Sequence, residues 1–396
     1  MGKLHILTTS IVKRVVNGKL QLILGIVVLV VSLVLVLAIF GCGDERPIAK
    51  PQPMPAPVPT TTNLIIYVDP VNGGDQNTGS EVAPLKTIQA AIDIAQPGSN
   101  IILAAGVYLQ DVISKRDGLP NAPITIRGPP TAIISGGGKS RIIEINNDYI
   151  VLDGFTIDGL HGDIDKASDY RNKLIYALGK ETRSGVTGLR ILNMTLRNSG
   201  GEAIRLRYFA QNNEVAYCTI SDCGIYDFKF GGGEDNGEGI YIGTAADQIG
   251  DGKNPTVEPD ESNNNWIHHN FIDTQGAECV DIKEGSSGNI VEYNTCTGQQ
   301  NPNTAGLQSR GNGNIFRNNE VYGNIGAGVR LGGDTPTDGI NNDVYMNNIH
   351  DNQSGGIKFM SKPQGRICSN TMLNNTGGNS VGTYKYLFTP TDKCGE

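Results

Sequence analysis

The segment 276–285, GAECVDIKEG, concentrates four charged side chains, Glu278, Asp281, Lys283 and Glu284. Asp281 and Lys283 are two residues apart, so on a strand they point to the same side. Carboxylate oxygens are the ligands that Ca²⁺ prefers, and a Lys amine can abstract a proton if a neighbouring cation lowers its pKa. These residue types indicate a site that joins a bound cation to a proton-abstracting base.

Further charged residues can reach this segment if neighbouring segments stack on it. Glu202, Glu238 and Glu278 begin three short segments at the same frame, so we expect them near one corner of the fold. Stacked carboxylates repel each other unless a bound Ca²⁺ or a nearby Arg lies between them. Arg310 should lie one rung from Lys283, where its charge would lower the pKa of the lysine.

The elements that must position these residues form a repeat. Several of its frames are 24 to 29 residues apart, a unit that holds strands and turns but no helix. In a coil of this size equivalent strands lie about 4.8 Å apart, and identical side chains form ladders. A polar residue precedes most of the apolar strands and another follows five positions on, which predicts an amide ladder along the turns, with the pairs Asp148 and Asp153, Gly188 and Asn193, Asn213 and Cys218, Asn265 and Asn270, Asn289 and Asn294, Asn314 and Asn319, and Asp343 and Asn348.

A second alternating segment follows most of these strands, with one buried and one outward face. Aligning the segments gives two outward columns, Arg205, Tyr241, Asp281, Gln308, Arg330, Lys358 and Arg207, Gly243, Lys283, Arg310, Gly332, Met360. Half of these positions are Lys or Arg, although the chain as a whole is acidic. The columns predict a groove for an anionic polysaccharide, while a solvated polar face is the alternative. The predicted substrate-binding residues are Arg205, Arg207, Tyr241, Arg330 and Lys358.

The ends of the repeat have their own signals. Residues 85–95 form an amphipathic pattern that predicts a helix capping the open end of the coil, ended by Pro97 and Gly98. Outside the cytoplasm the cysteines after Cys42 could pair, and Cys368 with Cys394 would fix the tail. For Cys218 and Cys279, small apolar filler in a stack is the alternative to pairing.

The first 45 residues are predicted to be a targeting and anchoring unit. Positive residues precede an apolar run at 20–40 that can span a bilayer, which places the rest of the chain outside the cytoplasm. The end of the run also resembles a lipoprotein signal with Cys42 as the lipidated residue, so a lipid anchor and an uncleaved signal anchor both stay open. Residues 46–63 are Pro-rich and should form an extended stalk, followed by one β domain at 64–396.

Composition limits the remaining classes. The 396 residues include 52 Gly, only 6% aromatic and 18% charged residues, which suits short strands with many tight turns. The net charge of −8 argues against general nucleic-acid binding, and we expect a monomer without a nucleic-acid partner.

The motifs YVDPVNGGDQNTGS and PLKTIQAAIDIAQPGSNIILAAGVY, together with the repeated N-x-x-x-x-N strands, resemble the pectate-lyase-like superfamily. The resemblance implies an all-β, single-stranded, right-handed parallel β-helix over nearly everything after the stalk. It does not select a function, because the superfamily includes lyases, epimerases, glycosidases, phage spikes and adhesins.

The segment 276–285 also resembles chondroitinase B and related alginate lyases, whose motif runs Glu-x-Glu-Ile-Ile-x-x-Lys-Ser with an Arg-His-Gly-Asn stretch a rung later. The resemblance implies that Glu278 is a Ca²⁺ ligand, that Lys283 is the catalytic base and that Arg310 assists it. Gly276 stands where the family has its first Glu, so Glu238 or Asp281 would complete the calcium site.

Two function classes follow from these residues. The first is a surface-tethered polysaccharide lyase that acts by β-elimination on uronic-acid polymers, or a uronan C5-epimerase that begins with the same proton abstraction. The second is a non-catalytic glycan-binding protein of the cell surface.

Two further groups of residues are weaker candidates. His268 and His269 are adjacent on a strand and are expected on opposite faces. His161, Asp163 and Asp165 could bind a cation in an insertion, although a solvated loop is the simpler interpretation.

Overall fold

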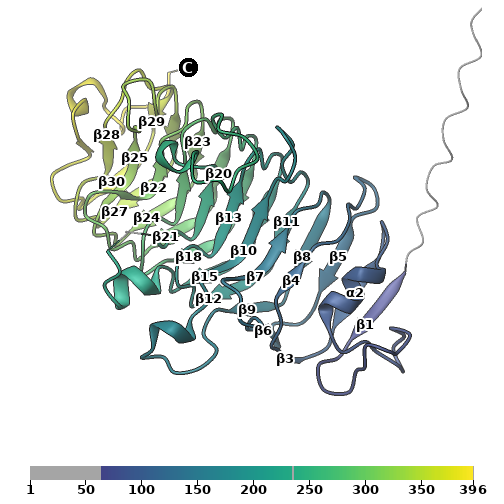
Figure 1. The fold of residues 1–396 in the computed structure, drawn as a ribbon. Coiled ribbons are helices and arrows are strands. Elements are labelled where there is room, and N and C mark those ends of the chain that lie inside the picture. Colours follow the sequence, from purple (N-terminus) through teal and green to yellow (C-terminus); the bar gives the residue numbers. More distant parts are fainter. Residues whose placement is uncertain (1–63, 234–235, 396) are drawn as a thin grey trace, which may run out of the picture. The chain divides into compact units, whose positions relative to one another are not determined.

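The computed structural model describes residues 64–233 and 236–395. The predicted anchor and stalk lie outside the described residues. Among the described helices, none is long and apolar enough to cross a membrane. Residues from 64 onward form one coil of short strands, which rises rung by rung from the purple to the yellow end of the chain (Figure 1).

Three parallel sheets run along this coil, and each rung after the first, which supplies only β1, contributes one strand to each sheet. The first sheet contains β1 (Ile65–Val68), β2 (Asn100–Leu103), β5 (Ile124–Arg127), β8 (Ile150–Asp153), β11 (Arg190–Leu192), β14 (Glu214–Ala216), β17 (Trp266–His268), β20 (Ile290–Glu292), β23 (Ile315–Arg317), β26 (Asp343–Tyr345) and β29 (Ile367–Cys368). The second contains β3 (Gly106–Tyr108), β6 (Ala132–Ile134), β9 (Thr156–Asp158), β12 (Thr195–Arg197), β15 (Thr219–Ser221), β18 (Phe271–Asp273), β21 (Thr295–Thr297), β24 (Glu320–Tyr322), β27 (Asn348–His350) and β30 (Thr371–Leu373). The third contains β4 (Val112–Ile113), β7 (Arg141–Ile145), β10 (Lys173–Leu178), β13 (Ile204–Arg207), β16 (Ile240–Ile242), β19 (Val280–Ile282), β22 (Ala305–Ser309), β25 (Ala327–Leu331), β28 (Ile357–Phe359) and β31 (Ser380–Val381).

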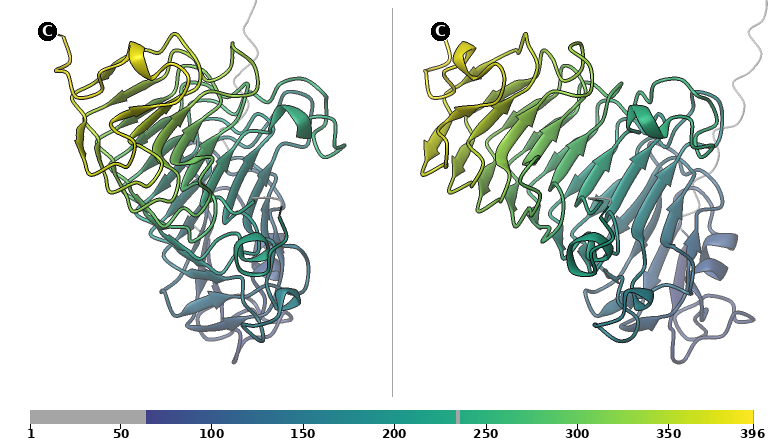
Figure 2. Two further views of the ribbon diagram at one scale, coloured as in Figure 1. Left: turned by 90° about the vertical axis from the view of Figure 1, so that its left-hand side faces the viewer. Right: turned by 60° about the vertical axis from the view of Figure 1, so that its left-hand side comes forward.

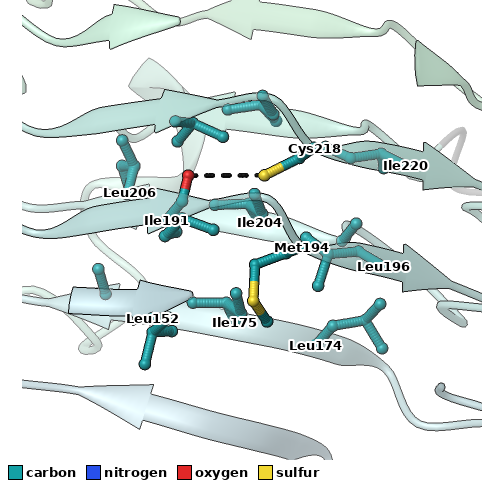
Figure 3. Close-up of a cluster of buried hydrophobic side chains, with 14 of the residues drawn as sticks. Leu152, Leu174, Ile175, Ile191, Met194, Leu196, Ile204, Leu206, Cys218 and Ile220 are labelled. Atoms are coloured by element: carbon teal, nitrogen blue, oxygen red, sulfur yellow. Dashed lines mark hydrogen bonds between the residues drawn. The ribbon is translucent and has the colours of Figure 1, made fainter. Parts of the chain in front are cut away.

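This arrangement confirms the predicted parallel β-helix. The interior is a continuous stack of aliphatic side chains, of which Figure 3 shows the part around Ile191, Ile204 and Ile175. Cys218 belongs to this stack as a buried free thiol, and its Sγ contacts the carbonyl oxygen of Ile191 at 3.5 Å. Apolar burial at every rung holds the coil together, since each inward residue loses its contact with water to the rungs above and below.

The predicted capping helix is present as α2 (Ile88–Ile94). It begins at Ile88 because the Thr87 hydroxyl accepts a hydrogen bond from the backbone N–H of Ala90, and it packs Ile88, Ala91 and Ile92 into the core. The remaining helices are short: η1 (Ala167–Asp169), η2 (Ile225–Lys229), η3 (Ala246–Gln248) and η4 (Lys385–Leu387). They belong to connections and to the tail, as the two views of Figure 2 show.

The described part of the chain contains two disulfides, one in the tail and one in the interior. Cys368 and Cys394 form the disulfide predicted for the tail. Cys279, for which pairing and apolar filler were both open, is bonded to Cys296. The two cysteines are neighbours across the interior because β19 and β21 belong to adjoining rungs, a proximity that their sequence separation of 17 does not reveal.

The predicted amide ladder exists, and it forms more than one column. At Asn294, the side-chain oxygen accepts hydrogen bonds from the backbone and side-chain N–H groups of Asn270 at 3.0 and 2.9 Å. Its amide nitrogen donates to Asn319 Oδ1 at 3.1 Å and to the carbonyl oxygen of Ile267 at 2.9 Å. Each buried amide therefore joins the rung on either side of it.

The predicted frame is wrong by one residue at some rungs. Asn342 and Asn347 continue the ladders, whereas Asp343 and Asn348 begin β26 and β27. Consecutive polar residues in this stretch fit more than one frame, and only the strand register selects between them. The same shift applies at Leu189, whose backbone N–H donates to Asn213, so Gly188 is outside the buried ladder. Asn193 still donates to Asp153, its predicted neighbour in the column, at 2.7 Å in an exposed position.

The ladder predicts that Asn294→Ala destabilises the protein by about 2 kcal/mol or more, because the amide groups of Asn270 lose their acceptor in a buried position. Urea unfolding followed by circular dichroism measures the change. Asn121→Ala, in an exposed turn, is the matched control and should leave the unfolding midpoint unchanged. Equal midpoints for both variants would contradict the stabilising role of the ladder.

Candidate functional site

The third sheet carries the predicted outward column. The registers pair Arg205 with Tyr241, Tyr241 with Asp281 and Asp281 with Gln308, and the column continues to Arg330 and Lys358. The sequence therefore predicted correctly which residues of these strands face inward and which face outward. The column lies outside the apolar interior, where connections between strands can cover it.

Three carboxylates meet where β16 and β19 begin. One oxygen from each of Glu238, Glu278 and Asp281 lies within 4.8 Å of the other two, and all three side chains are buried. Two oxygens bound to the same Ca²⁺ at about 2.4 Å can be at most about 4.8 Å apart, so this spacing allows all three to contact one ion. We call these three residues the carboxylate triad. Among the described residues, the triad is the single group of three or more His, Cys, Asp or Glu side chains placed so that they could share one cation.

Asp281 is the member of the triad that has an unsatisfied buried oxygen. Its carboxylate is completely buried, and its Oδ1 has no hydrogen-bond partner within the described structure. The nearest cation is the Lys283 ammonium, with Nζ 2.5 Å from Oδ2 of Asp281. Because buried carboxylate oxygens are normally saturated, the residues present fit a divalent cation held by oxygen ligands.

The electrostatics of the triad point in the same direction. Burial, together with the charges of the neighbouring carboxylates, raises the pKa of Glu238 to about 7 and that of Glu278 to about 8. Lys283 opposes this rise but does not cancel it. In the absence of another cation, these glutamates therefore hold protons at a pH where an exposed glutamate is ionised.

Lys283 is the member of the cluster that reaches furthest toward solvent, at 8% exposure. Burial by itself disfavours its charged form, but the charges of Asp281, Tyr241, Glu238 and Glu278 outweigh burial and raise its pKa above the ordinary value. The expectation that Arg310 lowers the pKa of Lys283 is therefore wrong for the protein without a bound cation. The physical reason is that the carboxylates around the amine dominate its field.

Arg310 is held by other partners. Its Nε lies 2.5 Å from Glu284 Oε1, and its Nη2 lies 2.6 Å from Asp334 Oδ2. Its backbone N–H donates to the carbonyl oxygen of Ile282, directly before Lys283, so Arg310 occupies the predicted neighbouring rung. Two carboxylates fix the guanidinium beside the site and favour its charged form, which raises its pKa.

Glu202 stacks with Glu238 and Glu278 as predicted, since Ile204, Ile240 and Val280 pair in register, but it is not part of the carboxylate triad. It binds Arg205 at 2.6 Å and forms a second ion pair with Lys173. Burial alone would raise the pKa of Glu202, but the two cations hold it at about 2. At this rung the stacked carboxylate is therefore offset by a nearby Arg, one of the two cations expected from the sequence.

The positive column is covered at Arg205 and Arg207. These side chains are only 3% and 2% exposed, so the alternative of a solvated polar face does not hold there, although both residues line a cavity. Arg207 donates to Asn254 at 2.6 Å and pairs with Asp251 at 2.8 Å. Both partners come from the connection 243–265, a segment with no repeat signal, so sequence reasoning missed them.

Asp260 anchors that connection. It is fully buried and accepts hydrogen bonds from the backbone N–H groups of Tyr208 and Phe209 at 2.7 and 2.8 Å and from the Thr244 hydroxyl at 2.6 Å. These bonds fix both ends of the connection against the edge of the third sheet. The polar column consequently becomes the lining of a covered site.

Tyr241 separates two regions of this site. The Arg205 guanidinium lies 3.5 Å from the centre of the tyrosine ring, and Lys283 Nζ lies 4.4 Å from it. Beyond Arg205, over β7, β10 and β13, is a cavity of about 590 Å³. Its lining includes Tyr176, Lys173 and Asp247, none of which the sequence singled out as functional.

Arg330 and Lys358 lie at the other end of the column and are partly exposed. Arg330 donates to Gln308 at 3.1 Å and to the carbonyl oxygen of Gly332 at 2.7 Å. Lys358 donates to the carbonyl oxygen of Asn303 at 2.8 Å. They stay substrate-binding predictions, since neither is drawn into the triad.

The histidine prediction is wrong. The Nδ1 atoms of His268 and His269 are 2.9 Å apart, because His269 adopts a φ of 54° at the end of β17 and breaks the alternation of the strand. The His269 ring stacks between Tyr217 and Tyr293, on the first sheet rather than the third. The second weak candidate also forms no cation site within the described residues, since Asp163 pairs with Lys166 and Asp165 pairs with Lys229.

Comparison with known proteins places the chain. The profile of the family described as "Protein of unknown function (DUF1565)" matches residues 71–304. The chain belongs to this family. The DUF1565 match includes the triad and Lys283 but ends before Arg310.

Two curated relatives match part of this chain. The uncharacterized protein YwoF of Bacillus subtilis is 31% identical over 24% of this chain, and the pectate lyase PEL9 of Emericella nidulans is 25% identical over 38% of it. The matched regions make up 22% and 38% of those relatives, so the chain spans well under half of their length.

Solved structures share the fold. An alginate lyase from Paenibacillus superposes with a TM-score of 0.56 at 21% identity, covering 74% of this chain and 96% of the lyase. The pectate lyase Pel9A superposes with a TM-score of 0.50 at 15% identity, covering 81% and 78%. A lacto-N-biosidase from Eubacterium ramulus gives 0.55 at 15% identity, covering 81% and 67%. The fold is therefore a pectate-lyase-like β-helix, and such identities carry the fold alone.

The pKa values of the triad predict that stability without divalent cations falls as the pH rises. Below about pH 4.5 the two glutamates are protonated in both folded and unfolded chains, and between pH 4.5 and about 8 only the folded chain keeps the protons. Folding should be weakest above pH 8, as measured by urea unfolding in EDTA. The double variant Glu238→Gln and Glu278→Gln should flatten this dependence, whereas Glu81→Gln, on an exposed loop, should retain it. A wild-type stability that rises over this range would contradict the raised values.

Proposed function

We propose that this protein is a polysaccharide lyase that cleaves uronic-acid-containing polysaccharides by β-elimination. The observation that carries the proposal is the convergence of the carboxylate triad on Lys283, with Arg310 on the next rung. The sequence match to a pectate lyase and the fold shared with alginate and pectate lyases support the class.

A divalent cation, Ca²⁺ by the hardness of the ligands, would be held by Glu238, Glu278 and Asp281. When bound, it would neutralise a uronate carboxylate and offset the triad charges that raise the pKa of Lys283. The remaining roles belong to the chain's own residues.

Lys283 is the proposed base. Its Nζ takes the proton from C5 of the uronate, a double bond forms between C4 and C5, and the C4–O bond breaks with its electron pair on the glycosidic oxygen. The ammonium formed on Lys283 returns the proton to that oxygen, so the amine is regenerated. Arg310, fixed by Glu284 and Asp334, assists by its positive charge on the neighbouring rung.

The proposed location is outside the cytoplasm, with the chain tethered through residues 1–45 and acting as a monomer. The two disulfides support an oxidising compartment, since such bonds are rare in the cytosol.

A lyase assay tests the reaction. Incubation with alginate, pectate or chondroitin in the presence of Ca²⁺ should raise the ultraviolet absorbance of unsaturated chain ends, and Lys283→Ala should reduce the rate by about 10³-fold or more. Lys86→Ala, an exposed lysine on the capping region, is the control and should keep full activity. Absence of new unsaturated ends with all three polymers rejects the lyase, and full activity of Lys283→Ala rejects the base.

Calorimetric titration with Ca²⁺ tests the cation site. Binding should raise the free energy of unfolding by about 2.7 kcal/mol at a hundred-fold excess over Kd. Glu278→Gln should weaken binding at least ten-fold because it removes one charged ligand from the triad. Glu81→Gln should bind like the wild type, and equal affinity in both variants would contradict the assignment.

A further inference from the structure

The cavity beyond Tyr241 is a second polar region that the proposed reaction does not use. Its volume is about 590 Å³, and it lies over β7, β10 and β13, while the triad lies at β16 and β19. Since neighbouring strands are about 4.8 Å apart, β10 is about 14 Å from the rung of Lys283. The cavity and the triad therefore occupy one face of the same sheet but cannot contact the same sugar.

The cations among the described residues that line the cavity already have acidic partners. Arg205 and Lys173 pair with Glu202, and Arg207 and Lys253 pair with Asp251. Arg141, the remaining cation of the lining, pairs with Glu144 at 2.8 Å. No cation of this lining is left without an acidic partner, so the cavity offers a second uronate carboxylate no unpaired charge.

The cavity lining also holds hydrogen-bond donors and acceptors that have no partner in the described structure. The carboxylate of Asp247 is exposed and has no partner among the described residues. The Tyr176 hydroxyl and the Nε of Arg205 are buried in the lining without hydrogen-bond partners there. Gln248 uses its oxygen for Arg205 and Tyr241, which leaves its amide nitrogen as a donor.

A sugar hydroxyl both donates and accepts, so this mixed lining suits it. An additional carboxylate would instead face the uncompensated charge of Asp247. The aromatic side chains of Tyr176 and Tyr226 add apolar surface to a lining that is otherwise polar.

We propose that this cavity binds an uncharged sugar unit of the substrate, about three rungs from Lys283, so that the natural substrate is a polymer containing both uronate and neutral sugars. The proposal rests on the proposed function for the uronate at the triad, but it concerns different residues. It assigns Asp247, Gln248 and Tyr176 as specificity-determining residues.

Binding to the Lys283→Ala variant separates this inference from the reaction. The probes are rhamnogalacturonan oligosaccharides, which alternate galacturonate with rhamnose, unsulfated chondroitin oligosaccharides, which alternate glucuronate with a neutral amino sugar, and oligogalacturonates of the same lengths. Calorimetry should give at least ten-fold tighter binding for one alternating probe than for the oligogalacturonate. The gain should appear only for oligosaccharides long enough to span about 14 Å.

Asp247→Ala, added to Lys283→Ala, should remove this preference without changing the melting temperature, because Asp247 has no partner within the described fold. Glu81→Ala is the matched control and should preserve it. Equal or tighter binding of the oligogalacturonate, or no binding of either alternating probe, overturns the inference. If the wild-type protein shows no lyase activity but the preference still depends on Asp247, the proposed reaction is rejected and the sugar site is retained.

Discussion

The stacking of each rung on the next in one register is the constraint on which the structure depends. Asn270, Asn294 and Asn319 satisfy it through buried amides that bond upward and downward at once. A one-residue slip would bring every inward aliphatic side chain of that strand to the outside. The ladder therefore fixes which residues of the third sheet face outward together, including those of the triad.

The same register is also the cause of electrostatic repulsion within the site. It brings Glu238, Glu278 and Asp281 together in a buried position, where like charges repel and water cannot screen them. Lys283 alone does not compensate them, because the glutamate pKa values stay raised to about 7 and 8. This arrangement suits the binding of a cation together with an anionic substrate, which is the basis of the proposed function.

Connections between the rungs decide what a substrate can meet. The segment 243–265 is fastened by Asp260 and turns the positive column of the third sheet into paired, buried charge. The result is two neighbouring environments divided by Tyr241: an acidic one around Lys283 and a nearly neutral, hydrogen-bonding one over β10. Their different chemistry suggests how one groove could distinguish the sugars of a mixed polymer.

The sequence by itself determined the β-helix, the cap at α2, the tail disulfide and the outward column from Arg205 to Lys358, because each is written in a local period or spacing. It also brought Glu238, Glu278, Asp281 and Lys283 to adjoining rungs. Only the tertiary structure decided that Lys173 and Arg205 neutralise Glu202 beside this cluster, and that Cys296 is the partner of Cys279. It also decided the burial of Arg207 beneath residues of a connection without any repeat. Periodicity specifies which face a side chain occupies, whereas its charge partners depend on non-repeating segments whose positions arise from contacts distant in sequence.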